Sequence, residues 1–93
     1  MYNVYFRSQA LKIFERLERK LKRKIIEALR KIGAGSWKEL DSEKLKGTKN
    51  GWRLRVSRWR ILYLVVTKKR TIEVVDIFLK KSDSDYARRS RLF

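Results

Sequence analysis

The chain has 93 residues, and its 26 lysines and arginines against 10 acidic residues give a formal net charge of +16. A hydrophobic fraction of 43% is too high for a disordered basic tail, so a single folded domain over residues 1–93 is expected. Cysteine and histidine are both absent, which excludes disulfides, thiol nucleophiles, the usual zinc sites and an imidazole base. No metal and no cofactor are therefore expected.

The positive charge favours a polyanionic partner, with nucleic acid as the first choice and an acidic protein as the second. The N-terminal sequence MYNVYFRSQA lacks the apolar run of a signal peptide. No stretch approaches the roughly 20 apolar residues that a membrane span needs. The sequence thus predicts a cytoplasmic protein that has no membrane partner.

The first half of the chain predicts one strand and two helices. Residues 2–6 are rich in aromatic and β-branched side chains and predict a strand, with Ser8 as the N-cap of the next helix. Apolar residues then recur every three or four positions over 9–32, which predicts helix. A single helix of that length would be about 36 Å long and would overhang strands of about 20 Å. We therefore predict a break near residues 18–21 and an α-helical hairpin.

The second half predicts a β-sheet. Gly33 and Gly35 end the second helix, and the mixed polar residues 36–51 are interpreted as a connection. An antiparallel meander follows from three β-rich runs, which cover residues 52–56, 59–66 and 71–79. Ser82 or Asp83 caps a predicted short C-terminal helix. The fold class is α+β, with an N-terminal strand and an α-helical hairpin packed on the meander.

Basic side chains gather on the predicted sheet. Strand alternation places Arg53 and Arg55 on one face, about 7 Å apart, and Arg60, Lys80 and Lys81 on nearby strands extend this surface. Two interpretations are open, a phosphate-binding site and a solvated face whose cations prevent aggregation. The phosphate-binding interpretation is favoured, because acidic residues that normally intersperse a solvated face are missing from these strands.

Several neighbouring residues also have two interpretations. Trp52 and Trp59 either stack on nucleobases or belong to the core. Asp76 lies in an apolar strand, where it pairs with a cation or sits at an edge; a catalytic base is the less favoured interpretation. Three lysines before the meander are suited to phosphate contacts or form a charged loop, namely Lys44, Lys46 and Lys49.

The segments KLKGTKNGWRLRVSRWRILYLV and TIEVVDIFLKKSDSDY resemble the RelE/ParE toxin superfamily of type II toxin-antitoxin systems. The shared features are a Lys-Leu-Lys-Gly run at 44–47, an aromatic residue with an alternating basic pair at 52–55, an aromatic-Arg-Ile-Leu-Tyr run at 59–63, and a basic cluster before a tyrosine at 80–86. This resemblance implies the compact, microbial-RNase-like fold of RelE.

The resemblance also implies a function. The RelE branch cleaves messenger RNA in the ribosomal A site, whereas the ParE branch inhibits DNA gyrase and lacks the basic cluster. Matched position by position, the catalytic residues it implies are Arg53, Arg55, Arg60, Lys80 and Tyr86. The further RNA-binding residues are Lys44, Lys46, Lys49, Arg58 and Lys81.

The expected function is therefore a ribosome-dependent endoribonuclease toxin, an mRNA interferase that inhibits translation by directing a 2′-hydroxyl against its own phosphate. Its expected partners are the ribosome, messenger RNA and a cognate acidic antitoxin. Two alternatives remain on the same fold, a non-catalytic basic RNA-binding module and a ParE-like gyrase inhibitor.

The sequence departs from RelE at the alternating basic pair. RelE has lysines where this chain has Arg53 and Arg55. Because arginine stays charged and cannot accept a proton, these two residues are expected to stabilise negative charge at phosphorus. The proton acceptor is left open among Lys80, Tyr86, Lys46 and the ribosomal RNA itself.

Overall fold

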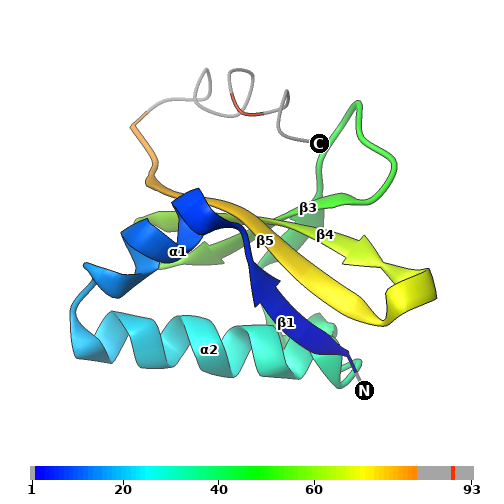
Figure 1. Ribbon diagram of the computed structural model, residues 1–93, viewed down its shortest axis with the longest axis horizontal. Coiled ribbons are helices and arrows are strands. Elements are labelled where there is room, and N and C mark those ends of the chain that lie inside the picture. The colour runs from blue at the N-terminus through cyan, green and yellow to red at the C-terminus, as the bar shows by residue number, and fades with distance from the viewer. Residues whose placement is uncertain (1, 82–88, 90–93) are drawn as a thin grey trace.

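The computed structural model describes residues 2–81 and Arg89, and it has two helices on one side of a five-stranded sheet (Figure 1). The elements in chain order are β1 (Asn3–Phe6), α1 (Ser8–Glu15), α2 (Arg19–Gly33), the 3-10 helix η1 (Trp37–Glu39), β2 (Ser42–Lys44), β3 (Gly51–Val56), β4 (Trp59–Val66), the 3-10 helix η2 (Thr67–Lys69) and β5 (Thr71–Leu79). The predicted α+β fold is confirmed. The predicted C-terminal helix and Tyr86 lie outside the described residues.

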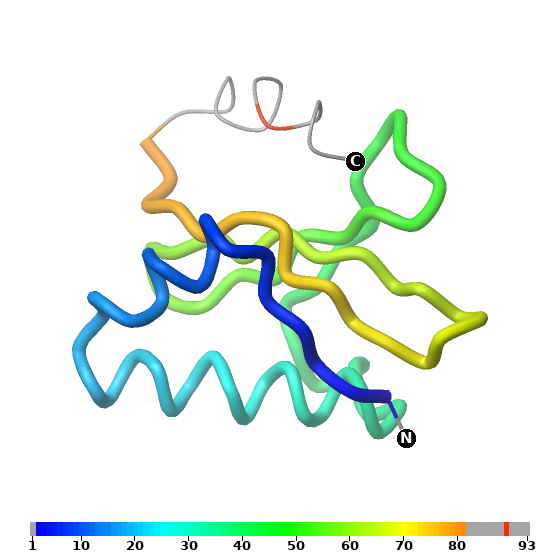
Figure 2. The backbone as a smooth tube through the Cα atoms, in the orientation of Figure 1, coloured from blue at the N-terminus to red at the C-terminus, as the bar shows by residue number. Residues whose placement is uncertain are grey.

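The strands follow the order β1-β5-β4-β3-β2. The pairs β3–β4 and β4–β5 are antiparallel and form the predicted meander. β1 lies beside β5 and pairs with it in parallel, so the whole sheet is mixed (Figure 2). A parallel pair needs a long crossover connection, and the helices with the remaining strands supply it.

The interpretation of residues 36–51 as a plain connection is wrong, because this segment contains η1 and β2. β2 pairs antiparallel with β3 and places Glu43 opposite Arg53. With three polar residues, Ser-Glu-Lys, β2 shows no apolar alternation from which a strand could be predicted.

The predicted helical hairpin is present, and its break falls at residues 16–18, between α1 and α2. The prediction of Ser8 as N-cap is wrong, because Arg7 occupies that position and makes no side-chain cap bond. The Arg7 N–H donates to the Val74 carbonyl at 3.0 Å, and the Arg7 carbonyl accepts from the Leu11 N–H at 2.9 Å. The pairing of β1 with β5 therefore decides where α1 begins.

Two glycines end α2, as predicted. A Cβ on Gly33 would lie 3.0 Å from the Tyr2 carbonyl oxygen, so the close approach of the N-terminal segment requires glycine there. Gly35 has φ +85°, in the left-handed region that favours glycine after a helix.

The sheet is apolar on both faces. One face packs against the helices, and we call it the helix face; its core residues are Ala10, Ile25, Ala28, Leu29, Leu54, Ile61, Tyr63, Ile72, Val74 and Ile77. The other face, here the open face, carries a smaller cluster of Leu62, Val75 and Phe78 with Leu45 and Leu64 at its margin. β4 contributes to both clusters, which confirms its prediction as a central strand.

Candidate functional site

Three arginines of the meander share the open face of the sheet. In the β3–β4 pairing, Arg53 lies opposite Leu62, whose side chain belongs to the open-face cluster. Arg55 lies opposite Arg60 two positions further along, so the same face carries both. We call Arg53, Arg55 and Arg60 the strand-arginine cluster. The structure thus brings together three of the predicted site residues.

Acidic residues hold one side of this cluster. The Arg53 guanidinium donates to Glu43 Oε2 at 2.6 Å and to Asp41 Oδ1 at 3.4 Å, and its side chain is only 8% exposed. Asp41 Oδ2 also lies 3.2 Å from Nη1 of Arg55, whose side chain is 47% exposed. The interpretation that acidic residues are missing from this surface is wrong, because Glu43 of β2 and Asp41 just before this strand both reach it. Arg53 is paired and buried, whereas Arg55 remains open to solvent on one side.

Arg60 is buried at the β3–β4 hairpin. Its Nη1 donates to the carbonyls of Ser57 at 3.1 Å and Trp59 at 2.9 Å. Its Nε is buried and has no hydrogen-bond partner in the described part of the chain. Like charges directly opposite each other on paired strands are unfavourable, so the Arg55–Arg60 pair costs stability. A repelling pair with an unused donor is the arrangement expected where an anion binds.

Lys80 lies near the same end of the sheet. Its N–H donates to the Arg58 carbonyl at 3.2 Å, one step beyond the pairing of Trp59 with Leu79. Arg58 is exposed in the hairpin loop, and Lys81 is exposed just after Lys80. The predicted basic surface is therefore gathered around the β3–β4 hairpin, and the placement of Tyr86 lies outside the described residues.

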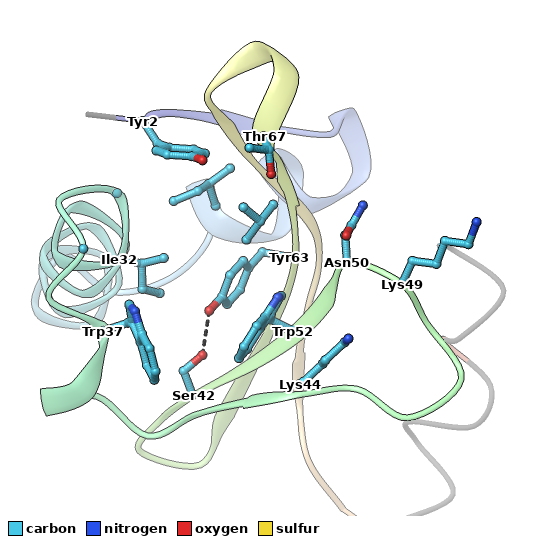
Figure 3. Close-up of a pocket in the computed structure, with 14 residues that line it drawn as sticks. Tyr2, Ile32, Trp37, Ser42, Lys44, Lys49, Asn50, Trp52, Tyr63 and Thr67 are labelled. Carbon is cyan, nitrogen blue, oxygen red and sulfur yellow. Dashed lines mark hydrogen bonds between the residues drawn. The ribbon is translucent and has the colours of Figure 1, made fainter.

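Two of the three predicted lysines of the β2–β3 region lie at the helix-face side of the sheet. Lys44 lies opposite Trp52, so it belongs to the helix face and not to the face of Arg53. Lys44 and Lys49 line a pocket of about 420 Å³ between the end of α2 and the sheet (Figure 3). Lys46 is exposed in the β2–β3 loop.

Aromatic side chains form the walls of this helix-face pocket. The Trp52 ring is stacked beside Tyr63, with centroids 6.5 Å apart, and Trp37 leans toward Trp52 (Figure 3). Trp52 and Trp59 both pack against the helix-face core, away from the strand-arginine cluster. This packing favours the core interpretation of these two tryptophans.

Among the described residues, the Tyr63 phenol has a clearly shifted pKa. Its hydroxyl lies 2.6 Å from the Ser42 hydroxyl. Burial raises the pKa of the Tyr63 phenol above its usual value of 10.0, and the Ser42 hydrogen bond and the Arg53 charge partly oppose this shift. The phenol stays protonated at neutral pH and acts as a structural link between β2 and β4.

Asp76 has the cationic partner that its position in an apolar strand requires. Arg89 Nε lies 2.6 Å from Asp76 Oδ2, and the Arg89 guanidinium stacks 3.9 Å above the Phe78 ring. Sequence reasoning missed Arg89 as a residue of the open face. It equally missed Asp41 and Glu43, although their spacing of two matches that of Arg53 and Arg55.

The chemistry that this site offers is charge and hydrogen-bond donation. Guanidinium groups bind phosphate oxygens and stabilise added negative charge, but they do not accept protons. Within residues 2–81 and Arg89, no group of three carboxylate, histidine or cysteine side chains is placed to hold a metal ion. The helices in this part of the chain are too short or too polar to cross a membrane.

Comparison with known proteins connects this fold to one group of solved structures. No family model and no curated protein matches the sequence. The isolated Escherichia coli RelE toxin matches with a TM-score of 0.75 and 18% identity, over 100% of both chains. The RelE–RelB complex of Pyrococcus horikoshii matches with a TM-score of 0.67 and 26% identity, over 82% of this chain and 91% of the other. The RelB–RelE complex of Methanococcus jannaschii matches with a TM-score of 0.70 and 25% identity, over 88% and 96%.

These matches define the class of the protein as a small α+β domain with the RelE toxin fold. The resemblance to RelE toxins predicted from residues 44–65 and 71–86 is thereby confirmed.

Proposed function

We propose that this protein is the toxin of a type II toxin-antitoxin system and acts as a ribosome-dependent endoribonuclease on messenger RNA. The observation that carries the proposal is the placement of Arg55 and Arg60 directly opposite each other on the open face, where Arg55 is half-exposed and the buried Arg60 Nε has no partner among the described residues. The likeness to RelE toxins, two of them in complexes with RelB, supports the same function.

The proposed reaction is attack of a ribose 2′-oxygen on the adjacent phosphorus, with cleavage of the bond to the 5′-oxygen. It needs removal of the 2′-proton, stabilisation of the extra charge at phosphorus and protonation of the leaving 5′-oxygen. Arg55 and Arg60 supply the charge stabilisation in this proposal. Proton transfer falls to Lys80, Lys46 or Tyr86, or to a group of the ribosomal RNA.

Arg53 has a different place in this proposal from Arg55. Two carboxylates already occupy its guanidinium, so it acts mainly by holding β2 against β3 and fixing the face from which Arg55 projects. Positioning and electrostatic stabilisation supply a large share of the acceleration of such reactions. A site poor in proton acceptors therefore suits a nuclease that works on the ribosome and cuts free RNA slowly.

The proposed partner is an acidic antitoxin whose segment covers the pocket on the helix face and the β2 edge. Trp37 is 47% exposed beside this pocket, and β2 is the last strand of the sheet. Lys44 and Lys49 stand at the rim of the aromatic walls. An apolar side chain of the antitoxin would fit the aromatic pocket, and carboxylates beside it would pair with the two lysines. An extended antitoxin segment can also pair with the free edge of β2.

The experiment uses purified protein and ribosomes programmed with a defined messenger RNA, with cleavage mapped by primer extension. We expect cuts in the A-site codon for the wild type and loss of at least 100-fold in rate for Arg60→Ala and for Arg55→Ala. Lys12→Ala, which removes one exposed charge from α1, is the matched control and keeps the wild-type rate.

Three other results would reject the nuclease. Cleavage that survives both arginine changes would remove the assigned site. RNA binding without cleavage on ribosomes would select the non-catalytic module. DNA damage with intact messenger RNA in expressing cells would select gyrase inhibition.

A further inference from the structure

The exposed side of α2 carries two parallel rows of cations. Arg19, Arg23 and Arg30 are four and seven residues apart, which is about one and two helical turns, so they line up along the helix. We call them the helix arginine row. Lys20, Lys24 and Lys31 have the same spacing one position later and form a neighbouring lysine row. All six side chains are exposed.

The helix arginine row has no acidic partner in the described part of the chain. Lys31 pairs with Glu39 at 3.8 Å, but no carboxylate lies within ion-pair distance of Arg19, Arg23 or Arg30 among residues 2–81 and Arg89. Together with Lys22, Ile26 and Glu27, these arginines line a shallow groove of about 360 Å³. The groove is therefore a concave, mainly cationic surface, with four basic residues and one carboxylate, Glu27, in its lining.

The charges at the start of α2 oppose its own stability. Its first turn contains no acidic residue and begins with Arg19-Lys20, where the helix dipole favours negative charge. Like charges at a spacing of four, such as Arg19 and Arg23, repel each other. A net charge of +16 far exceeds what solubility needs in so small a domain. This conflict between charge and local structure indicates a role outside the folded chain.

The helix arginine row and the strand-arginine cluster lie on opposite sides of the molecule. The core residues Ile25, Ala28 and Leu29 of α2 face the sheet, so the exposed arginines point away from it. Figure 1 shows α2 on one side of the sheet. The strand pairing places Arg55 and Arg60 on the other side, the open face. A short single strand of RNA bound at one surface would therefore not contact the other surface as well.

We infer that the helix arginine row is a second nucleic-acid surface, which binds the phosphate backbone of double-helical RNA while the open face holds the strand to be cut. The choice of RNA rests on the proposed function. The row spans about 16 Å along the helix, a length over which a duplex presents several phosphates. Arginine matches phosphate through paired N–H donors.

An acidic protein is the less suitable occupant of this groove. Protein interfaces have apolar or aromatic centres that are depleted in charge. The groove has Ile26 as its one apolar lining residue and no aromatic one. Its regular cations instead match a repeating anion.

The test compares two variants of equal charge. One is Arg19→Gln/Arg23→Gln/Arg30→Gln, and the other is Lys20→Gln/Lys24→Gln/Lys31→Gln; glutamine preserves helix propensity. The probe is a fluorescent RNA hairpin with a stem of about 16 base pairs, titrated by anisotropy over a range of salt concentrations. We expect the arginine-row variant to bind at least tenfold more weakly and to lose about two to three units of salt slope. The lysine-row variant should lose less than about one unit.

Further arms separate binding from folding. The variant Arg19→Lys/Arg23→Lys/Arg30→Lys keeps the charges and should keep most of the salt slope. Thermal melting should show that the arginine-to-glutamine variant is at least as stable as the wild type, because repulsion on α2 is relieved. Weak binding by a stable protein supports the surface.

If the two glutamine variants lost the same RNA affinity, net charge alone would explain the effect and the inference would be overturned. It would also be overturned if neither variant lost RNA affinity. Poly-L-glutamate is titrated as a second probe that stands for an acidic protein. If the arginine-row variant lost more affinity for poly-L-glutamate than for RNA, the surface would be assigned to an acidic protein and the inference would be overturned. Since binding is measured here and not cleavage, a row-specific loss in a protein that cuts nothing would reject the proposed function alone.

Discussion

Glu43 and Arg53 face each other across the β2–β3 pair, and the carboxylate of the first accepts a 2.6 Å hydrogen bond from the guanidinium of the second. This contact lies at the margin of the surface proposed for the RNA phosphate. A carboxylate at that position competes with a phosphate for the same donors and repels it. Glu43 therefore lowers the affinity of the site while it orders β2.

Replacing this carboxylate should strengthen RNA binding. Glu43→Gln is expected to raise affinity for a short single-stranded RNA about fivefold, or about 1 kcal/mol. Glu39→Gln is the matched control, because Glu39 is similarly exposed, at 73% against 77%, and pairs with Lys31 on the other side of the molecule. Anisotropy titrations at one salt concentration measure both. Equal gains in the two variants would show that net charge alone is responsible.

Arg53 and Arg55 should separate stability from binding. Arg53→Ala removes a buried side chain with two ionic hydrogen bonds, so the free energy of unfolding should fall by about 1 to 2 kcal/mol. Arg55→Ala removes a half-exposed partner of Asp41 and should cost less than about 0.5 kcal/mol. Arg55→Ala should nevertheless weaken RNA binding more. Urea denaturation and anisotropy measure the two effects, and identical profiles would contradict the assignment.

Much of the fold could be predicted because the strongest signals are local. The runs that became β3, β4 and β5 are rich in β-branched and aromatic residues, and the predicted bounds differ from the observed ones only at Gly51. β2 escaped prediction because three polar residues carry no pattern. The parallel pairing of β1 with β5 is a long-range relationship, which propensity does not encode.

The candidate site could be predicted where strand alternation alone decides it. Period two places Arg53 and Arg55 on one face, and the pairing of Arg55 with Arg60 follows from the short hairpin loop. The partners of Arg53 could not be predicted, because they depend on the register of β2. The same register places Lys44 on the helix face. This placement could not be predicted either, because it depends on the pairing of β2 with β3.

The hairpin loop offers a stability test near the site. Ser57 has φ 58° at the first position of the two-residue β3–β4 loop, the geometry in which a type II′ turn favours glycine. Ser57→Gly should therefore raise the free energy of unfolding by about 0.5 kcal/mol, since relief of backbone strain outweighs the added entropy of the unfolded chain.

Arg58→Gly in the same loop is the control, because among the described residues only Ser57 of this pair has positive φ. It should lower stability by about 0.5 to 1 kcal/mol. Thermal melts of the two variants measure this difference. Stabilisation by both changes would contradict the assigned turn geometry.

The buried Tyr63 phenol gives stability a dependence on alkaline pH. Its pKa is raised in the folded protein by burial, so the folded state keeps a proton that the unfolded state releases near the usual value of 10.0. The contribution of Tyr63 is complete below that pH and is lost as the pH rises through 10.0 toward the higher folded pKa. Tyr63→Phe has no such proton, so its unfolding free energy should fall less steeply over the same range. Urea denaturation from about pH 8 to 11 measures both slopes, and parallel curves would show that the phenol ionises equally well in the folded chain.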